Sequence, residues 1–194
     1  MTSRERMLAA IRQNKPEASP LPTLPSFAEP EEDLVGLFTE AVEKVGGTVW
    51  QGMTTDELTQ RIAQQYPDVR HSWSADHTLL PGSVTIAEET LPASLADVDV
   101  ALLRGTLGVA ENGAIWVPEE EVPQRVLAFI TQHLILVLDQ QKMVWNMHQA
   151  YQKLGTNLSG FGLFISGPSK TADIEQSLVV GAHGPRSLTV CLVK

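Results

Sequence analysis

The chain has one cysteine and few basic residues, and these two scarcities exclude several classes of protein. Its one cysteine, Cys191, cannot form an internal disulfide and cannot by itself hold a cysteine-ligated iron–sulfur cluster. Cys191 lies in the apolar run SLTVCLV, which is typical of a packed, unreactive thiol. The formal net charge of -9 argues against binding to nucleic acid or to an anionic membrane surface, because both need a basic face.

Long apolar runs are also missing. No window approaches the roughly 18 consecutive apolar residues of a membrane-spanning helix. The first residues, MTSRERMLAAIRQNKP, show neither the apolar segment nor the cleavage site of a signal peptide, so a cytoplasmic protein is expected. The histidines lack metal-ligand spacing, and neither a metal site nor a bound cofactor is predicted for this chain.

The sequence does contain enough apolar residues for one sizeable core. It has 194 residues, of which 43% are hydrophobic and 19% charged, as in ordinary globular proteins. Residues 3–14 have a helical apolar stripe and a capping box at Thr2 and Glu5. Five prolines follow within residues 15–30, which indicates an extended linker. We therefore expect an N-terminal helix and proline-rich linker over 1–30 and a single domain over 31–194.

Strand and helix patterns alternate after residue 30. Helices are predicted at 31–45, at 54–66 and at 140–154, the last with Asp139 as its cap, and strands at 48–51, 84–86, 98–103, 114–117, 134–138, 161–165 and 187–193. Residues 118–131 fit either a helix or a strand. The continuous run LILVL at 134–138 is typical of a strand buried in a parallel sheet. The pattern predicts an α/β fold with a mostly parallel sheet flanked by helices.

A small, polar chain reversal follows the strand at 161–165. The segment SGPSKTADIE is expected to open a helical turn near Thr171, so that the backbone amides of Ser169, Lys170 and Thr171 and the Lys170 ammonium would face an anion. It does not match the GxxxxGK[ST] phosphate loop. The alternative is an ordinary connection in which Ser169 or Thr171 caps the helix.

Two other polar residues stand at chain reversals. Glu111, in the sequence AENG, could act as a nucleophile, a base or an orienting group at a strand end, or it could belong to a solvated turn at Asn112-Gly113. His183, in GAHGP, could titrate near neutrality or contact an anion, or it could bond to local backbone.

The last part of the chain resembles a known family. SGPSKTADIEQSLVVGAHGPRSLTVCLV is similar to the C-terminal signature of LUD-domain proteins of the lactate-utilisation protein C type. ADVDVALLRGTLGVAENGAIWV and SRERMLAAIRQN resemble two earlier blocks of that family. The chain departs from the pattern with Leu103-Arg104-Gly105-Thr106, where such proteins usually carry a Thr-Gly-Ala-Asp-like run, and with Asn112, where they usually carry Thr. The identity of a ligand is therefore not carried over.

The resemblance implies a fold of the NagB/RpiA/CoA transferase-like group. It also implies the small subunit of a three-component system that oxidises L-lactate to pyruvate, with iron–sulfur clusters on the partner subunits. A further likeness is to class I CoA-transferases, whose nucleophilic glutamate lies in Ser-Glu-Asn-Gly, because residues 110–113 match three of those four residues.

Three hypotheses follow for the function. The first is an accessory subunit of a lactate-oxidising complex that binds a small anion, the second is an acyl- or CoA-transfer enzyme with Glu111 as catalytic nucleophile, and the third is a sugar-phosphate-binding module. The predicted ligand-binding residues are Asn112, Gly113, Ser166, Gly167, Ser169, Lys170, Thr171, Asp173 and His183. All three hypotheses expect the Glu111 carboxylate and the reversal after residue 165 to meet at the same edge of a single sheet and to form one cleft.

Overall fold

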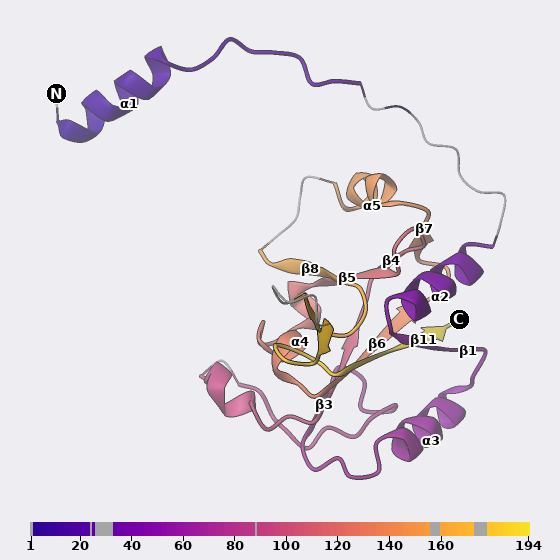
Figure 1. Cartoon of the computed structure of the whole chain (residues 1–194). Coiled ribbons are helices and arrows are strands. Elements are labelled where there is room, and N and C mark those ends of the chain that lie inside the picture. Colours follow the sequence, from indigo (N-terminus) through magenta and orange to yellow (C-terminus); the bar gives the residue numbers. More distant parts are fainter. Residues whose placement is uncertain (1, 24, 26–32, 88, 156–159, 173–177) are drawn as a thin grey trace.

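A five-stranded parallel sheet forms the centre of the molecule. The computed structural model describes residues 2–23, 25, 33–87, 89–155, 160–172 and 178–194 (Figure 1). The sheet has the order β1-β11-β6-β3-β2, and every neighbouring pair is parallel. Its strands are β1 (Thr48–Gln51), β2 (Ser72–Ser74), β3 (Val100–Arg104), β6 (His133–Asp139) and β11 (Ser187–Val193). The predicted α/β fold with a mostly parallel sheet is confirmed.

The position of β6 in the middle of the sheet explains why its sequence is apolar throughout. Leu134, Leu136 and Leu138 of β6 enter the hydrophobic core on one face of the sheet. Ile135 and Val137 enter a second core on the other face. Because both faces are covered, successive side chains are all buried, and the alternating pattern of a half-exposed strand is lost.

A second sheet covers one face of the central sheet. It has the order β7-β4-β5-β8, with β5 antiparallel to both of its neighbours. Its strands are β4 (Leu107–Val109), β5 (Ala114–Pro118), β7 (Met143–Val144) and β8 (Gly162–Ile165). A separate two-stranded antiparallel ribbon pairs β9 (Lys170–Ala172) with β10 (Leu178–Val180).

Helices close both sides of this arrangement. Leu58 and Ile62 of α3 pack in the core on one face of the central sheet, and Phe38 and Val42 of α2 pack in the core on the other. Ala150 of α5 packs in a third cluster, against the second sheet. The helices are α1 (Ser3–Gln13), α2 (Leu34–Lys44), α3 (Thr55–Gln65), α4 (Leu127–Ile130) and α5 (Met147–Leu154), with short 3-10 turns at η1 (Pro92–Leu95) and η2 (Glu119–Glu121).

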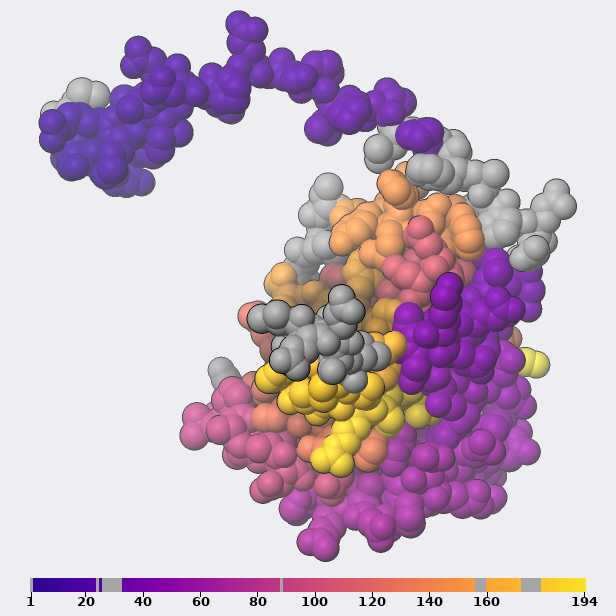
Figure 2. Space-filling view, viewed as in Figure 1, coloured from indigo at the N-terminus to yellow at the C-terminus, as the bar shows by residue number. Residues whose placement is uncertain are grey.

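Helix α1 lies apart from these layers. Its predicted capping box is present, with the Thr2 side chain and Glu5 satisfying each other's backbone amides. None of its residues is buried, and Met7 and Ile11 of its apolar stripe are 59% and 66% exposed. Figure 2 shows this helix and the following segment projecting from the body of the molecule. Within the residues that the structure covers, no helix is long and apolar enough to cross a membrane.

Several local predictions were wrong. Residues 84–86 form no strand, although Val84 and Ile86 pack against the core. Asp139 does not begin a helix, because Met143 and Val144 are buried as β7 beside β4, and α5 begins only after Asn146, whose side chain accepts from the Gln149 amide. In residues 118–131, which fit both a helix and a strand, the structure forms η2 and α4.

The strand at 161–165 also differs from the expected arrangement. It does not join the parallel sheet but pairs with β5 in antiparallel fashion, and it is only partly buried along its length. The strand β4, which the sequence did not predict, lies between β3 and β5 along the chain. A pattern of three residues is too short to distinguish a strand from the surrounding loop. These residues are buried as part of the second sheet.

Candidate functional site

Two of the predicted segments meet at one end of the second sheet. Residues 111–113 form the turn between β4 and β5, and Ser166 follows β8 directly. The Ser166 hydroxyl donates a hydrogen bond of 2.7 Å to the carbonyl oxygen of Asn112. The turn at 111–113 and the reversal after 165 therefore lie side by side, at an end of the second sheet and not of the parallel one, but the Glu111 side chain is exposed and does not share a cleft with the reversal.

Close packing under α2 explains two of the glycines in these segments. Gly113 and Gly167 have positive φ angles of 66° and 76°. A Cβ atom on Gly113 would lie 2.8 Å from the Val42 amide nitrogen, and one on Gly167 would lie 2.8 Å from the Val45 carbonyl oxygen. Both positions therefore need glycine for backbone conformation and for space. Their presence does not by itself indicate a ligand.

The loop after β8 does not form the predicted helical turn. Residues 170–172 form β9 and pair with β10, and the Thr171 hydroxyl donates to the Val179 carbonyl oxygen at 3.3 Å. The Ser169 amide donates to the Pro185 carbonyl oxygen at 2.9 Å, and the Gly181 amide donates to the Ser169 carbonyl oxygen at 2.9 Å. The prediction of a helix N-terminus with amides facing an anion is therefore wrong. Through these hydrogen bonds the loop is instead attached to the Gly-x-His-Gly-Pro turn at residues 181–185.

Five predicted residues nevertheless line one pocket, which we call the signature pocket. It has a volume of about 320 Å³, and these five are Ser166, Gly167, Ser169, Lys170 and His183. The rest of its lining is largely apolar and comes from the segment around α4 and from β8, the start of β6 and the start of β11; it includes Phe129, Leu134, Leu163, Phe164 and Leu188. The lining of the pocket thus combines residues that carry hydroxyl, ammonium and imidazole groups with apolar residues. This combination suits a small organic anion.

The Lys170 side chain lies next to the end of α2. A Cβ atom on Gly46, which follows the C-cap of α2, would be 3.7 Å from the Lys170 ammonium nitrogen. The C-terminus of a helix carries partial negative charge, so it holds an ammonium group favourably. Lys170 is exposed. Its ammonium is therefore positioned by the protein at the rim of the pocket.

Glu111 does not line the signature pocket. One of its carboxylate oxygens accepts a 3.0 Å hydrogen bond from the amide of Met147, the first residue of α5, and the side chain is exposed. The Asn112 side chain accepts from the Ala114 amide at 3.0 Å and so shapes the turn. Asp173 lies outside the described residues. Among the residues that are described, no cluster of three or more His, Cys, Asp or Glu could hold a metal ion.

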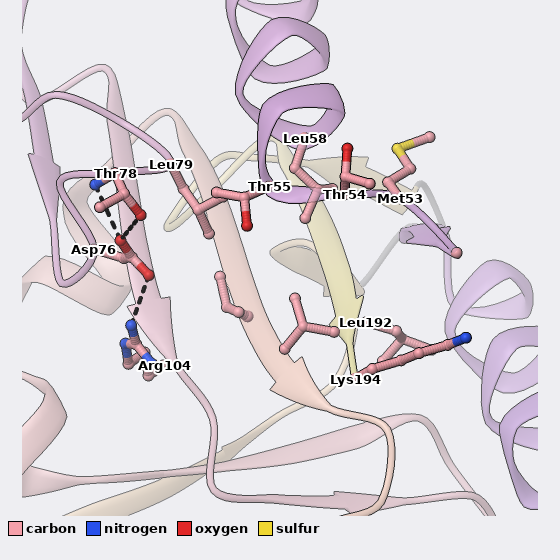
Figure 3. A pocket seen from close by; sticks show the side chains of 13 residues that line it. Met53, Thr54, Thr55, Leu58, Asp76, Thr78, Leu79, Arg104, Leu192 and Lys194 are labelled. Carbon is pink, nitrogen blue, oxygen red and sulfur yellow. Dashed lines mark hydrogen bonds and ion pairs between the residues drawn. The ribbon is translucent and has the colours of Figure 1, made fainter.

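A second cavity, which the sequence analysis missed, lies at the carboxyl ends of the parallel strands. We call it the Arg104 cavity; it has a volume of about 460 Å³. Its lining comes from the ends of β1, β3, β6 and β11, from the loop after β2 and from the start of α3, and it includes Thr54, Thr55, Leu58, Asp76, Thr78, Leu79, Arg104 and Leu192 (Figure 3). Since strand ends were predicted just before Thr54 and Arg104, their meeting at one edge could have been deduced once the strand order was known.

An ion pair lies at one side of this cavity. The Arg104 guanidinium donates to the Asp76 carboxylate at 2.6 Å, with side-chain exposures of 48% and 16%. The same carboxylate accepts from the hydroxyl and from the amide of Thr78, at 2.5 Å and 3.0 Å. The Thr78 hydroxyl, together with the Thr78 amide and the Arg104 charge, lowers the pKa of Asp76 below its ordinary value. Asp76 is therefore ionised at neutral pH and holds Arg104 in place.

The pKa of one thiol is also shifted. Burial raises the pKa of Cys191 to about 12. The residue is fully buried in β11, in the core shared with α3. The thiol is therefore protonated at neutral pH, which confirms the prediction of a packed and unreactive cysteine.

Comparison with known proteins places these features in a family. A family model described as the LUD domain matches residues 26–193. The chain is 33% identical, over 74% of its length and 63% of the relative's, to an uncharacterized protein, NMB1437, of Neisseria meningitidis. It is 36% identical to lactate utilization protein C of Shouchella clausii, over 52% of this chain and 44% of that protein. The matched part of the chain thus spans less than two thirds of the length of these relatives.

Two more comparisons agree with this match. The chain is 27% identical to lactate utilization protein C of a Geobacillus species, over 79% of this chain and 66% of that protein. The crystal structure of a DUF162 family protein from Deinococcus radiodurans has a TM-score of 0.66 and 19% identity, and the match covers 83% of this chain and 96% of that one. At that identity the likeness concerns the fold alone. Since the family model covers most of the sequence, the chain belongs to the LUD domain family.

Proposed function

We propose that the chain is a component of a lactate-utilisation system, in which it acts beside iron–sulfur subunits that oxidise L-lactate to pyruvate. Relatives named lactate utilization protein C support the general role. The single, buried cysteine is consistent with an arrangement in which the partners hold the clusters, because one thiol of raised pKa cannot ligate a cluster alone.

In this proposal the signature pocket binds a small anionic ligand. The observation that carries the proposal is that five residues from two separate loops of the signature line a single pocket. The Lys170 ammonium would hold the charged end of the ligand, and the hydroxyls of Ser166 and Ser169 would orient it. The apolar side chains of Phe129, Leu134 and Leu188 would contact the hydrocarbon part.

The test combines growth with co-purification. Cells that lack the gene are expected to fail on L-lactate as carbon source, and the wild-type chain is expected to restore growth and to co-purify with iron–sulfur partners. The double variant Lys170→Ala/His183→Ala should co-purify normally but restore growth poorly. Lys142→Ala, which removes an exposed ammonium in the turn between β6 and β7, is the matched control and should restore growth fully.

Two results would contradict the proposal. Normal growth of the deletion strain on L-lactate would exclude the physiological role. Full restoration of growth by the double variant would exclude the signature pocket as its site. The acyl-transfer alternative stays a hypothesis. Among the described residues, Glu111 accepts a hydrogen bond from the Met147 amide through one carboxylate oxygen, and this contact does not favour it. Incubation with acyl-CoA and then hydroxylamine should modify Glu111 if that hypothesis holds.

A further inference from the structure

We propose that the Arg104 cavity is a second binding site, which takes a small hydroxylated organic anion. In this proposal the Arg104 guanidinium binds the anionic end of the ligand, and the Asp76 carboxylate accepts a hydrogen bond from a ligand hydroxyl. The cavity shares no lining residue with the signature pocket. The inference is therefore independent of the function proposed above.

The position of the cavity favours a ligand site. In an open sheet of parallel strands, side chains and loops that follow the carboxyl ends converge at one edge, where such folds bind their ligands. Here the strand order brings the last residue of β3, the residues after β1 and β2 and the end of β11 to one cavity of about 460 Å³. That volume lies within the range of small-molecule sites.

The state of Arg104 favours an anion. A guanidinium has five N–H donors in a planar fork, and the Asp76 contact of 2.6 Å is made through one terminal nitrogen. The arginine side chain is 48% exposed, so it can be reached from solvent. Because Thr78 fixes Asp76, and Asp76 fixes Arg104, the fork is oriented before a ligand arrives, which reduces the entropy lost on binding.

The remaining lining favours hydroxyl groups on the ligand and a limited apolar part. Figure 3 shows the hydroxyl of Thr55 directed toward the cavity from the start of α3. The Thr54 hydroxyl is already used, since it donates to the Glu57 carboxylate at 2.9 Å. Leu58, Leu79 and Leu192 supply apolar surface. An ionised Asp76 would repel a second negative charge near it but would accept a hydrogen bond from a neutral hydroxyl.

The test uses matched probes with the full chain. Calorimetry compares L-lactate with propionate, and glycerol 3-phosphate with propyl phosphate, so that each pair shares an anionic end and a carbon chain and differs in hydroxyl groups. At least one hydroxylated probe is expected to bind with a dissociation constant below about 10 mM and more tightly than the probe of the same pair that lacks the hydroxyl groups. The two pairs also decide whether the cavity prefers a carboxylate or a phosphate end.

Variants assign the binding to this cavity. Arg104→Ala is expected to raise the dissociation constant of the probe about 10- to 100-fold, because the charge-assisted hydrogen bonds between the guanidinium and the anion are lost. Asp76→Ala should remove the preference for the hydroxylated member of the pair, because no side-chain acceptor remains at that position. Arg125→Ala is the matched control, since Arg125 forms an equally short ion pair of 2.6 Å with Glu119 away from the cavity, and it should leave the affinity unchanged. Thermal unfolding verifies that each variant is folded. Arg104→Lys, which keeps the positive charge but not the planar guanidinium, should bind the probe with an affinity between those of the wild type and Arg104→Ala.

Three results would overturn the inference. The first is that none of the four probes binds below about 10 mM. The second is that Arg104→Ala and Arg104→Lys both bind as tightly as the wild type. The third is that binding is lost in Lys170→Ala/His183→Ala and kept in Arg104→Ala, which would place the ligand in the signature pocket and would leave the function proposed above intact.

Discussion

Three polar side chains of the two cavities are placed by neighbouring protein groups. Ser166 donates to the Asn112 carbonyl, Lys170 lies at the end of α2, and Arg104 donates to Asp76. The Ser166 oxygen can still accept a hydrogen bond, and the Arg104 guanidinium has further N–H donors for another partner. Single residues in this structure therefore combine a packing role with a possible binding role, and substitution must separate the two.

Gly167 offers such a separation. We expect Gly167→Ala to lower the free energy of unfolding by about 2–4 kcal/mol, because it adds a Cβ at positive φ and places it 2.8 Å from the Val45 carbonyl. Gly52→Ala is the control: its φ of 71° is similar, but no atom of the described residues lies within 4 Å of its Cβ position, so a loss of about 1 kcal/mol is expected. Urea unfolding measures both. Equal losses would show that close packing against α2 is not the reason for glycine at 167.

Helix N-termini show, at the scale of elements, that the same local signal can have different consequences. Thr2 with Glu5 and Thr54 with Glu57 form two capping boxes of the same kind. Helix α3 then buries Leu58 and Ile62 against the central sheet, whereas α1 buries nothing. A capping box thus marks where a helix begins but does not indicate whether that helix packs.

The two capping threonines give a paired prediction. Thr54→Ala should lower the free energy of unfolding of the whole domain by about 1 kcal/mol, because the cap of a packed helix is lost. Thr2→Ala should leave that free energy unchanged, since α1 adds no buried surface to the domain. Thermal or urea unfolding monitored through the tryptophans compares the two variants. An equal loss in Thr2→Ala would show that α1 packs on the domain in solution.

Elements with a strong local pattern were predictable, and those defined by a partner strand were not. The LILVL run and the capping boxes identified β6, α1 and α3 from sequence alone. The short strands β4, β7 and β9 owe their conformation to pairing, and β9 was mistaken for the start of a helix because Ser and Thr suit both a helix cap and a tight loop. The Arg104 cavity was missed for the same reason, since it exists only once the strand order is fixed.

At the scale of the whole molecule, the hydrophobic clusters of the described residues form without helix α1. The three clusters draw on both sheets and on the helices from α2 onward, and among the described residues none before Leu34 belongs to them. In Figure 1, helix α1 therefore lies outside the packed layers, and we call residues 2–23 the N-terminal arm.

This arrangement predicts that the arm is dispensable for folding. Removal of residues 1–14 should change the free energy of unfolding by less than about 0.5 kcal/mol, because no side chain of α1 is buried against the domain. The control is Leu58→Ala, which removes a side chain that is 1% exposed in the α3 core and should cost about 2–5 kcal/mol. If the truncation instead costs as much as the core substitution, the apolar stripe at Met7 and Ile11 is covered in the isolated protein. If it costs nothing, the stripe stays exposed on a folded domain, where an apolar helix face is available to a partner.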